Sequence, residues 1–175
     1  MPETRTVTVG RLHAEHWQTY CAIRLAMLKE SPSAFGGTYE ESASNAEADW
    51  KQRLTDNVVL LAQTDGSAAG SAMYSVRGVS DPVDCCMYGM WVDPHFRRAR
   101  VGQILVKAVL AQARSAGKRR VILHVVVDNL GAKALYEREG FVATGRSKPH
   151  PHIDQLSEVE MEYVIEDHLV PTPPV

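Results

Sequence analysis

A nearly continuous apolar run, Val121 to Val127, restricts the fold of this chain more than any other segment. A strand with one face in solvent alternates apolar and polar residues, but only His124 interrupts this run. The run therefore predicts a strand that is buried on both faces. Helical patterns precede and follow it, so the sheet that contains it carries helices, as in a mixed α/β domain.

The rest of the chain supplies further strands and helices for one such sheet. The predicted strands are Thr6 to Val9, Val58 to Gln63, Ala69 to Val76, Cys85 to Val92, Val121 to Val127, Phe141 to Thr144 and Val159 to Ile165. The predicted helices run from His13 to Lys29, over an acidic stretch that ends near Leu54, from Val101 to Gly117, and from Asp128 or Asn129 to Glu139. We expect one α+β domain over residues 1–166 and a proline-rich, disordered tail over residues 167–175.

Charge and composition limit the classes of partner. The formal net charge of -2 gives no general attraction to nucleic acid or to an anionic membrane. No apolar run reaches the length of a membrane span, and the first residues lack an apolar signal segment, so we expect a cytoplasmic protein. The cysteines Cys21, Cys85 and Cys86 lack metal-ligand spacing and predict free thiols and no metal site. An activated Cys85 or Cys86 nucleophile is the alternative.

The segment from Met90 to Gln103 joins a strand to a helix through a basic loop. Val92-Asp93-Pro94 marks a turn, and arginines follow at positions 97, 98 and 100. A helix start offers unpaired backbone N–H groups and the positive end of its dipole, which together can hold phosphate. Guanidinium groups add charge and directed donors. The segment predicts a pyrophosphate site, with a solvated surface loop as the alternative, and it matches neither a Walker P-loop nor G-x-G-x-x-G.

A second segment, from Asp128 to Phe141, has the pattern Asn-x-x-Ala-x-x-x-Tyr followed by Gly-Phe. These positions are Asn129, Ala132, Tyr136, Gly140 and Phe141. Together the two segments resemble the GCN5-related N-acetyltransferase (GNAT) superfamily, whose first motif is Gln/Arg-x-x-Gly-x-Gly/Ala after a V-x-P turn. The resemblance implies a mostly antiparallel sheet of about seven strands with about four helices. It also implies transfer of acetyl from acetyl-coenzyme A (acetyl-CoA) to a primary amine.

The resemblance also assigns contacts with acetyl-CoA. Backbone N–H groups of Met90, Trp91 and Val92 are expected to bond the pantetheine arm and the thioester, because this strand separates from its neighbour in the family. Gly89 suits a bulge that opens such a gap. The residues expected around the pyrophosphate are Arg97, Arg98, Ala99, Arg100, Val101, Gly102 and Gln103, and those expected to complete the cofactor site are Asn129 and Ala132.

Arg100 departs from the family pattern, because it stands where the first glycine of the loop belongs. One interpretation is that its guanidinium binds phosphate, which preserves the site. The other is that the loop is impaired and the chain is a non-catalytic module that binds or senses acyl-CoA.

Two residues are candidates for proton transfer. Tyr136 matches the family's general acid, and a phenol with a pKa near ~10 can donate its proton at neutral pH. His124 is the candidate base, since some relatives that acetylate protein N-termini carry a glutamate there; a packed core histidine is the alternative. Glu40 and Glu41 are weaker candidates.

The acceptor is an amine of unspecified kind. A small molecule, an amino-sugar antibiotic, a protein N-terminus or a lysine would fit. The acidic stretch from Glu40 to Asp49 and the segment from Lys148 to His152 are candidates for the border of its cleft, with a solvated helix face as the alternative for the acidic stretch. The resemblance is also compatible with a homodimer.

Overall fold

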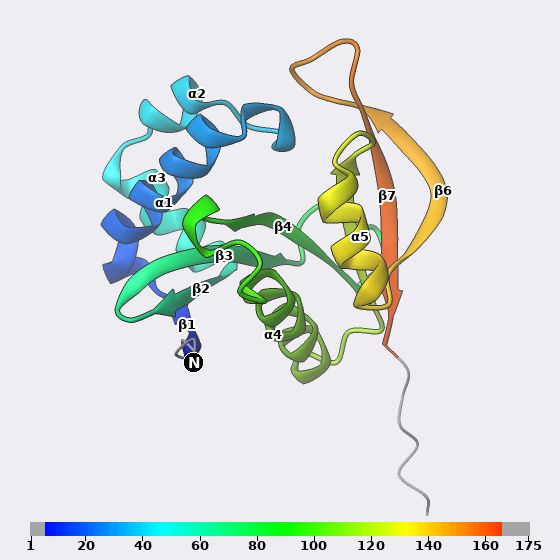
Figure 1. Ribbon diagram of the computed structural model, residues 1–175, viewed down its shortest axis with the longest axis horizontal. Coiled ribbons are helices and arrows are strands. Elements are labelled where there is room, and N and C mark those ends of the chain that lie inside the picture. The colour runs from blue at the N-terminus through cyan, green and yellow to red at the C-terminus, as the bar shows by residue number, and fades with distance from the viewer. Residues whose placement is uncertain (1–5, 166–175) are drawn as a thin grey trace, which may run out of the picture.

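The computed structural model describes residues 6–165, and within them the strands form a seven-stranded sheet in the order β1-β2-β3-β4-β5-β7-β6 (Figure 1). The strands are β1 (Val7–Leu12), β2 (Val58–Thr64), β3 (Ser67–Ser75), β4 (Asp84–Val92), β5 (Arg120–Val126), β6 (Val142–Pro149) and β7 (Ser157–Val164). Neighbouring strands pair antiparallel except β4 and β5, which are parallel. The predicted mixed fold with a mostly antiparallel sheet is confirmed.

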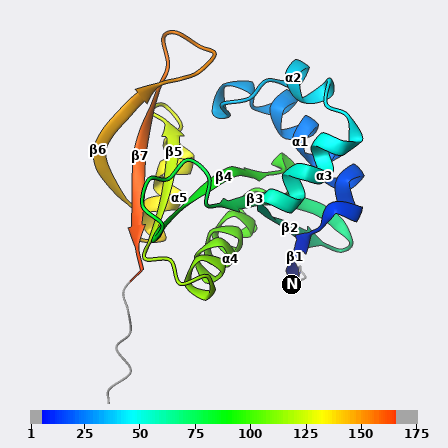
Figure 2. The same ribbon diagram turned by 180° about the vertical axis from the view of Figure 1, so that it is seen from behind.

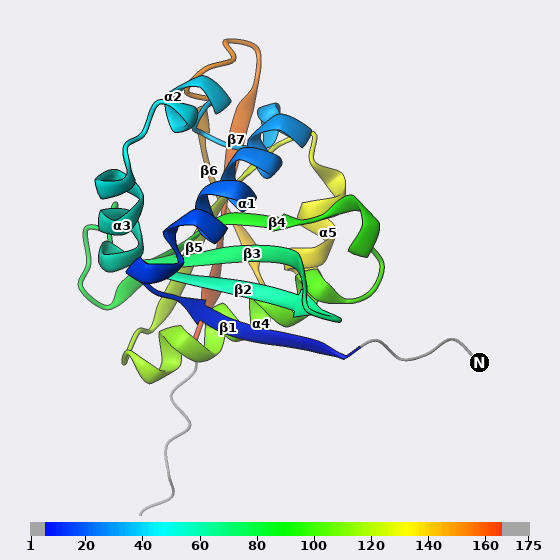
Figure 3. The same ribbon diagram turned by 90° about the vertical axis from the view of Figure 1, so that its left-hand side faces the viewer.

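Helices cover both faces of this sheet (Figures 2 and 3). In the described part of the chain the α-helices are α1 (Trp17–Glu30), α2 (Tyr39–Ala43), α3 (Glu47–Asp56), α4 (Val101–Ser115) and α5 (Leu130–Arg138). Helices α1 to α3 lie over one face, and α4 packs on the other. Among residues 6–165 no helix is both long and apolar enough to span a bilayer.

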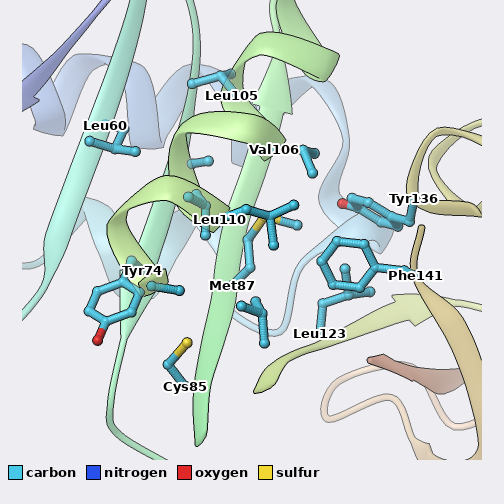
Figure 4. Close-up of a cluster of buried hydrophobic side chains, with 14 of the residues drawn as sticks. Leu60, Tyr74, Cys85, Met87, Leu105, Val106, Leu110, Leu123, Tyr136 and Phe141 are labelled. Carbon is cyan, nitrogen blue, oxygen red and sulfur yellow. The ribbon is translucent and has the colours of Figure 1, made fainter. Parts of the chain in front are cut away.

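The apolar composition of the central strands explains why both faces are covered. Along β2, Val58, Leu60 and Ala62 join the core under α4, whereas Val59 and Leu61 join the core under α1 and α3. Adjacent strand residues point to opposite faces, so an unbroken apolar run requires a helical layer on each side. Strand β5 likewise supplies Leu123 to the core under α4 (Figure 4).

Several element boundaries differ from the sequence prediction: α1, for example, begins at Trp17 and not at His13. Three of the differences have a clear structural cause. Gly10 does not end β1, because it continues the ladder opposite Leu61. The acidic stretch forms two helices, since Thr38 and Asp49 each accept a hydrogen bond from a backbone N–H and so start α2 and α3 separately. Strand β6 extends to Pro149, opposite Ser157, because it pairs with β7 far beyond Thr144. The predicted tail at residues 167–175 lies outside the described residues.

Gly70 of β3 lies very close to the backbone of β4 and also close to α4. A Cβ at this position would lie 2.5 Å from the backbone oxygen of Trp91 and 3.2 Å from Cδ1 of Leu105. We expect Gly70→Ala to lower the free energy of unfolding by about 1–3 kcal/mol, because a backbone atom cannot easily move away. Urea denaturation followed by circular dichroism measures this loss.

Gly10→Ala is the matched control, because a Cβ at Gly10 meets nothing within 4 Å. Its stability should equal or slightly exceed that of the wild type. Equal stability of the Gly70 and Gly10 variants would contradict the packing argument.

Candidate active site

Strands β4 and β5 separate after the first three residues of each strand. They pair only at Asp84↔Arg120, Cys85↔Val121 and Cys86↔Ile122. Beyond Cys86, β4 stays paired with β3, and β5 stays paired with β7 up to Val126. The backbone of β4 after Cys86 therefore has an edge that no described strand occupies.

A bulge in β4 lies at the beginning of this free edge. Ser71 of β3 pairs with Trp91 and Met73 pairs with Tyr88, so β4 has one extra residue between the two pairs. Gly89 lies in this interval with φ 55°, a left-handed conformation that glycine adopts without strain. The bulge predicted at Gly89 is thus present, and it changes the direction in which the backbone of Met90 points.

The loop between β4 and α4 positions the start of α4 at the same edge. Asp93 caps the turn by accepting a hydrogen bond from the backbone N–H of His95 at 2.8 Å. Arg98 and Arg100 both have left-handed backbone conformations, with φ of 67° and 62°. Arg100 is the N-cap of α4, so the N–H groups of the next helical turn lack acceptors within the helix. The glycine of the family pattern is therefore replaced at a position whose backbone favours glycine.

A cleft of about 1000 Å³ connects these features. The predicted site residues that line it are Met90, Trp91, Val92, Arg97, Arg98, Arg100, Val101, Gly102, Gln103, Asn129, Ala132 and Tyr136. Ala99 and His124 are the predicted site residues outside this lining. Residues that the sequence analysis did not assign also line it, among them Ser31, Ala34 and Phe35, which follow α1. They carry no local signal, because only the packing of α1 brings them to the cleft.

The three arginines of the loop differ in their contacts. Arg97 donates from Nε to the backbone oxygen of Val92 at 3.1 Å and from Nη2 to Oε2 of Glu30 at 2.9 Å. The side chain of Arg97 thus ties the loop to α1 and β4. Arg98 and Arg100 are exposed, and in the described chain neither side chain has an ion pair, so both guanidinium groups are available at the cleft.

Glu30 at the end of α1 is the hydrogen-bond acceptor that joins α1 to β4 and to the loop after it. It also accepts a hydrogen bond from Nε1 of Trp91 at 3.0 Å. Burial acts to raise the pKa of Glu30, but hydrogen bonds from Ser31, Trp91 and Arg97 outweigh it and keep the pKa below its ordinary value. The carboxylate is therefore charged at neutral pH and joins α1 to β4. Sequence reasoning missed this residue, since Trp91 and Arg97 lie more than sixty positions away from it.

Helix α5 forms the opposite wall of the cleft. The side chain of Asn129 caps it by accepting from the backbone N–H of Ala132 at 3.2 Å, which gives these two motif positions a structural reason. Gln103 of α4 donates to Glu139 at 2.7 Å and joins the two helices. A Cβ on Gly102 would lie 3.0 Å from Cδ2 of Leu135, so α4 approaches α5 closely at this glycine.

Tyr136 projects from α5 between the core and the cleft. Its side chain is only 6% exposed and its ring lies 5.8 Å from that of Phe141 (Figure 4). Burial raises the pKa of Tyr136 above its ordinary value. The phenol therefore keeps its proton across the neutral range and can donate it to a group in the cleft.

His124 of β5 lies beside strand β7 instead. Its Nε2 is 3.5 Å from Oε2 of Glu160, and its buried Nδ1 has no partner within the described residues. Burial lowers the pKa of His124, the charge of Lys148 lowers it further, and Glu160 opposes both. The imidazole is neutral at physiological pH and can accept a proton.

The cysteines and the weaker base candidates have other surroundings. Burial is the main cause that raises the pKa of Cys85 to about 12, and burial also raises the pKa of Cys86. Neither is a thiolate nucleophile at neutral pH. Glu41 accepts from the backbone N–H of Thr38 at 3.1 Å and serves as a helix cap. Glu40 lines a cavity of about 490 Å³ together with His150 and His152.

The sequence profile of the acetyltransferase (GNAT) family matches residues 24–141, which is more than half of the chain. The chain therefore belongs to the GNAT acetyltransferase family. Two curated relatives match over shorter segments. Human N-acetyltransferase 8 is 39% identical over 61 residues, 35% of this chain and 27% of that protein. Mycothiol acetyltransferase of Geodermatophilus obscurus is 40% identical over 55 residues, 31% of this chain and 18% of that protein.

Solved structures share the fold over nearly the whole chain. A GNAT acetyltransferase from Streptococcus pneumoniae superposes with a TM-score of 0.76 at 17% identity, covering 91% of this chain and 100% of that one. The ribosomal-protein-alanine N-acetyltransferase of Brucella melitensis gives 0.76 at 17% identity, covering 90% and 99%. An acetyltransferase from Salmonella typhimurium, solved with its cofactor acetyl-CoA, gives 0.73 at 17% identity, covering 97% and 99%.

The left-handed backbone of Arg100 leads to a test of stability. Arg100→Gly and Arg100→Ala both remove the charge, but only glycine relieves the unfavourable conformation. We expect the glycine variant to be more stable than the alanine variant by about 1 kcal/mol. Urea denaturation of the two variants measures the difference, and an alanine variant of equal or greater stability would contradict it.

Proposed function

We propose that this protein transfers the acetyl group of acetyl-CoA to a primary amine by direct attack. The observation that carries the proposal is the free edge of β4 after Cys86, which faces a cleft between the start of α4 and Tyr136. Membership of the GNAT family and the Salmonella relative with bound acetyl-CoA support it.

The residues of the cleft fit the parts of acetyl-CoA. The unpaired N–H groups at the start of α4 and the guanidinium groups of Arg98 and Arg100 suit a pyrophosphate. The free edge of β4 at Met90 and Val92 suits the amide groups of a pantetheine arm, which would bond to it as another strand does. Acetyl-CoA, when bound, supplies the acetyl group as a thioester.

Transfer requires the movement of two protons. The amine nitrogen bonds to the acetyl carbon, the C–S bond breaks, and its electron pair stays on sulfur. Tyr136 is the proposed donor of a proton to that sulfur, because its phenol is protonated and lines the cleft. The attacking amine loses its proton to a base.

His124 is the proposed base, acting through water because it lies outside the lining of the cleft. A lysine-like amine with a pKa of about 10.4 needs roughly 4–5 kcal/mol to deprotonate at pH 7. An α-amine near 7.7–8.0 needs only about 1 kcal/mol, so it demands less of a base. The neutral imidazole of His124 suits the second kind of acceptor better.

The first test combines binding with turnover. Calorimetry should detect acetyl-CoA binding to the wild type, and an amine panel should release free CoA thiol together with an acetylated product. Binding without thiol release would favour a non-catalytic acyl-CoA-binding module. Thiol release without an acetylated amine would indicate hydrolysis of the thioester.

Tyr136→Phe tests the proposed acid. The substitution removes the phenolic oxygen and keeps the ring that packs against Phe141. We expect kcat to fall by about 10²–10⁴-fold, as for loss of a general acid, while the Kd for acetyl-CoA stays nearly unchanged. Stopped-flow or steady-state thiol release measures kcat, and calorimetry measures Kd. Unchanged kcat would remove this role from Tyr136.

His124→Ala tests the proposed base through the pH profile. Because the pKa of His124 is lowered, the imidazole loses its proton below about pH 6.5, and kcat/KM of the wild type should rise with pH there. The variant should lose this acidic limb. It should keep any rise above pH 7 that arises from the amine itself. A variant with the same acidic limb would assign His124 to the core.

A further inference from the structure

Arg24 of α1 is a buried charge that no carboxylate within residues 6–165 neutralises. The charged side chains buried within residues 6–165 are Arg24, Asp84 and Glu158. Asp84 pairs with Arg120 and Glu158 with Lys148, but no carboxylate of the described chain forms an ion pair with Arg24. A buried guanidinium without a partner is strongly unfavourable, so its presence requires an explanation.

The contacts of Arg24 are weak ones. The residue is only 8% exposed, and its buried Nε has no hydrogen-bond partner in the described chain. Nη1 donates to Sδ of Met27 at 3.3 Å, and the guanidinium lies 5.8 Å from the centre of the Phe35 ring. Neither contact compensates a full charge, because a thioether is a poor acceptor and an aromatic face is not an anion.

Arg24 lines a second cavity, of about 720 Å³, next to the cofactor cleft. Phe35 lines both cavities, and Gly89 of the second directly precedes Met90 of the first. A ligand in the second cavity would therefore lie beside the bulge of β4, where the thioester is proposed to sit. An amine that attacks the thioester from this side would lie in this second cavity.

Two glycines leave space next to the guanidinium. A Cβ on Gly37 would lie 2.9 Å from Nη2 of Arg24, and a Cβ on Gly89 would lie 3.9 Å from Nη1. Both glycines line the second cavity. A side chain at Gly37 would therefore crowd Nη2 of Arg24.

The other charged residues that line this cavity are Arg53, Arg77, Asp49 and Asp56. Arg77 is paired with Asp56 at 2.8 Å, and Asp49 accepts from the backbone N–H of Ala46 at 2.8 Å, so both aspartates are engaged. Arg53 lines the cavity and has no ion pair in the described chain. Burial is the main cause that lowers the pKa of Arg24; Tyr20 opposes it, and the charge of Arg53 lowers the pKa further. An anionic ligand would relieve this repulsion.

We propose that the acceptor is a small amine that carries a carboxylate, such as an amino acid, and that Arg24 binds this carboxylate. The proposal rests on the acetyl transfer proposed above. The guanidinium fork matches a carboxylate with paired hydrogen bonds, and burial strengthens such a pair. With its carboxylate held by Arg24, the acceptor can direct its amine past Phe35 toward Met90.

The experiment compares amines with and without this charge at equal concentrations of unprotonated amine, because a carboxamide lowers the pKa of the neighbouring amine. Standard amino acids and β-alanine are assayed against their carboxamides, with 2-aminoethylphosphonate as a different anion. We expect kcat/KM to be at least about tenfold higher for carboxylates, which is the size expected for a charge-assisted hydrogen bond. Arg24→Met should abolish the preference, and Arg24→Lys should keep part of it. Arg114→Met is the control and should retain the preference, since Arg114 of α4 donates to Tyr163 and lines neither cavity.

A binding readout separates this proposal from the catalytic one. The unfolding midpoint of each protein is measured with CoA and either the acid or the amide. Stabilisation by acids that depends on Arg24, without turnover, would support the anion site and count against acetyl transfer. Equal turnover of acids and amides, or an unchanged preference in Arg24→Met, would overturn the anion site alone. Preference for the phosphonate would overturn the carboxylate class of acceptor. The absence of both binding and turnover would overturn both proposals.

Arg24→Met is also expected to fold. It exchanges an unpaired buried charge for an apolar side chain of similar length, which is neutral or stabilising in comparable sites. Its free energy of unfolding should be equal to or above that of the wild type. A large loss would show that the guanidinium has a structural partner and would contradict the proposal.

Discussion

The separation of β4 from β5 is the constraint on which the rest of the site depends. Pairing stops after Cys86↔Ile122, although both strands continue. Backbone N–H and C=O groups must be satisfied by some partner, so an edge inside a covered sheet is an available binding surface. The bulge at Gly89 marks the beginning of that edge, and the helices α4 and α5 form its walls.

Charge is distributed unevenly around this opening. Near the start of α4, Glu30 neutralises Arg97 and leaves Arg98 and Arg100 exposed at the cofactor cleft. On the other side of Phe35, Arg24 and Arg53 line a cavity whose two aspartates are already engaged. Two anion-favouring cavities therefore meet at one aromatic side chain. Because α1 supplies Arg24 and Glu30, its packing on the sheet determines both.

The sequence predicted the elements well where their signals were local. Apolar runs fixed β2 and β5, and the side chain of Asn129 capped α5 as expected. Limits that depend on pairing were missed, such as the continuation of β1 through Gly10 opposite Leu61. In the site, the motif positions around Gly102 and Tyr136 meet in one cleft, whereas His124 lies beside β7. Glu30 and Arg24 gave no signal, because the partners of Glu30 and the isolation of Arg24 arise only on folding.

The sequence by itself determined the family, the order of strands and helices, and the motif residues of the cofactor cleft, because these depend on local periodicity, caps and spacing. The tertiary structure decided how those residues are used. It placed Arg100 in a left-handed conformation, engaged Arg97 with Glu30, and buried Arg24 without a counter-ion from the described residues. Burial and long-range pairing set the free energy of each charge, and neither can be read from neighbours along the chain.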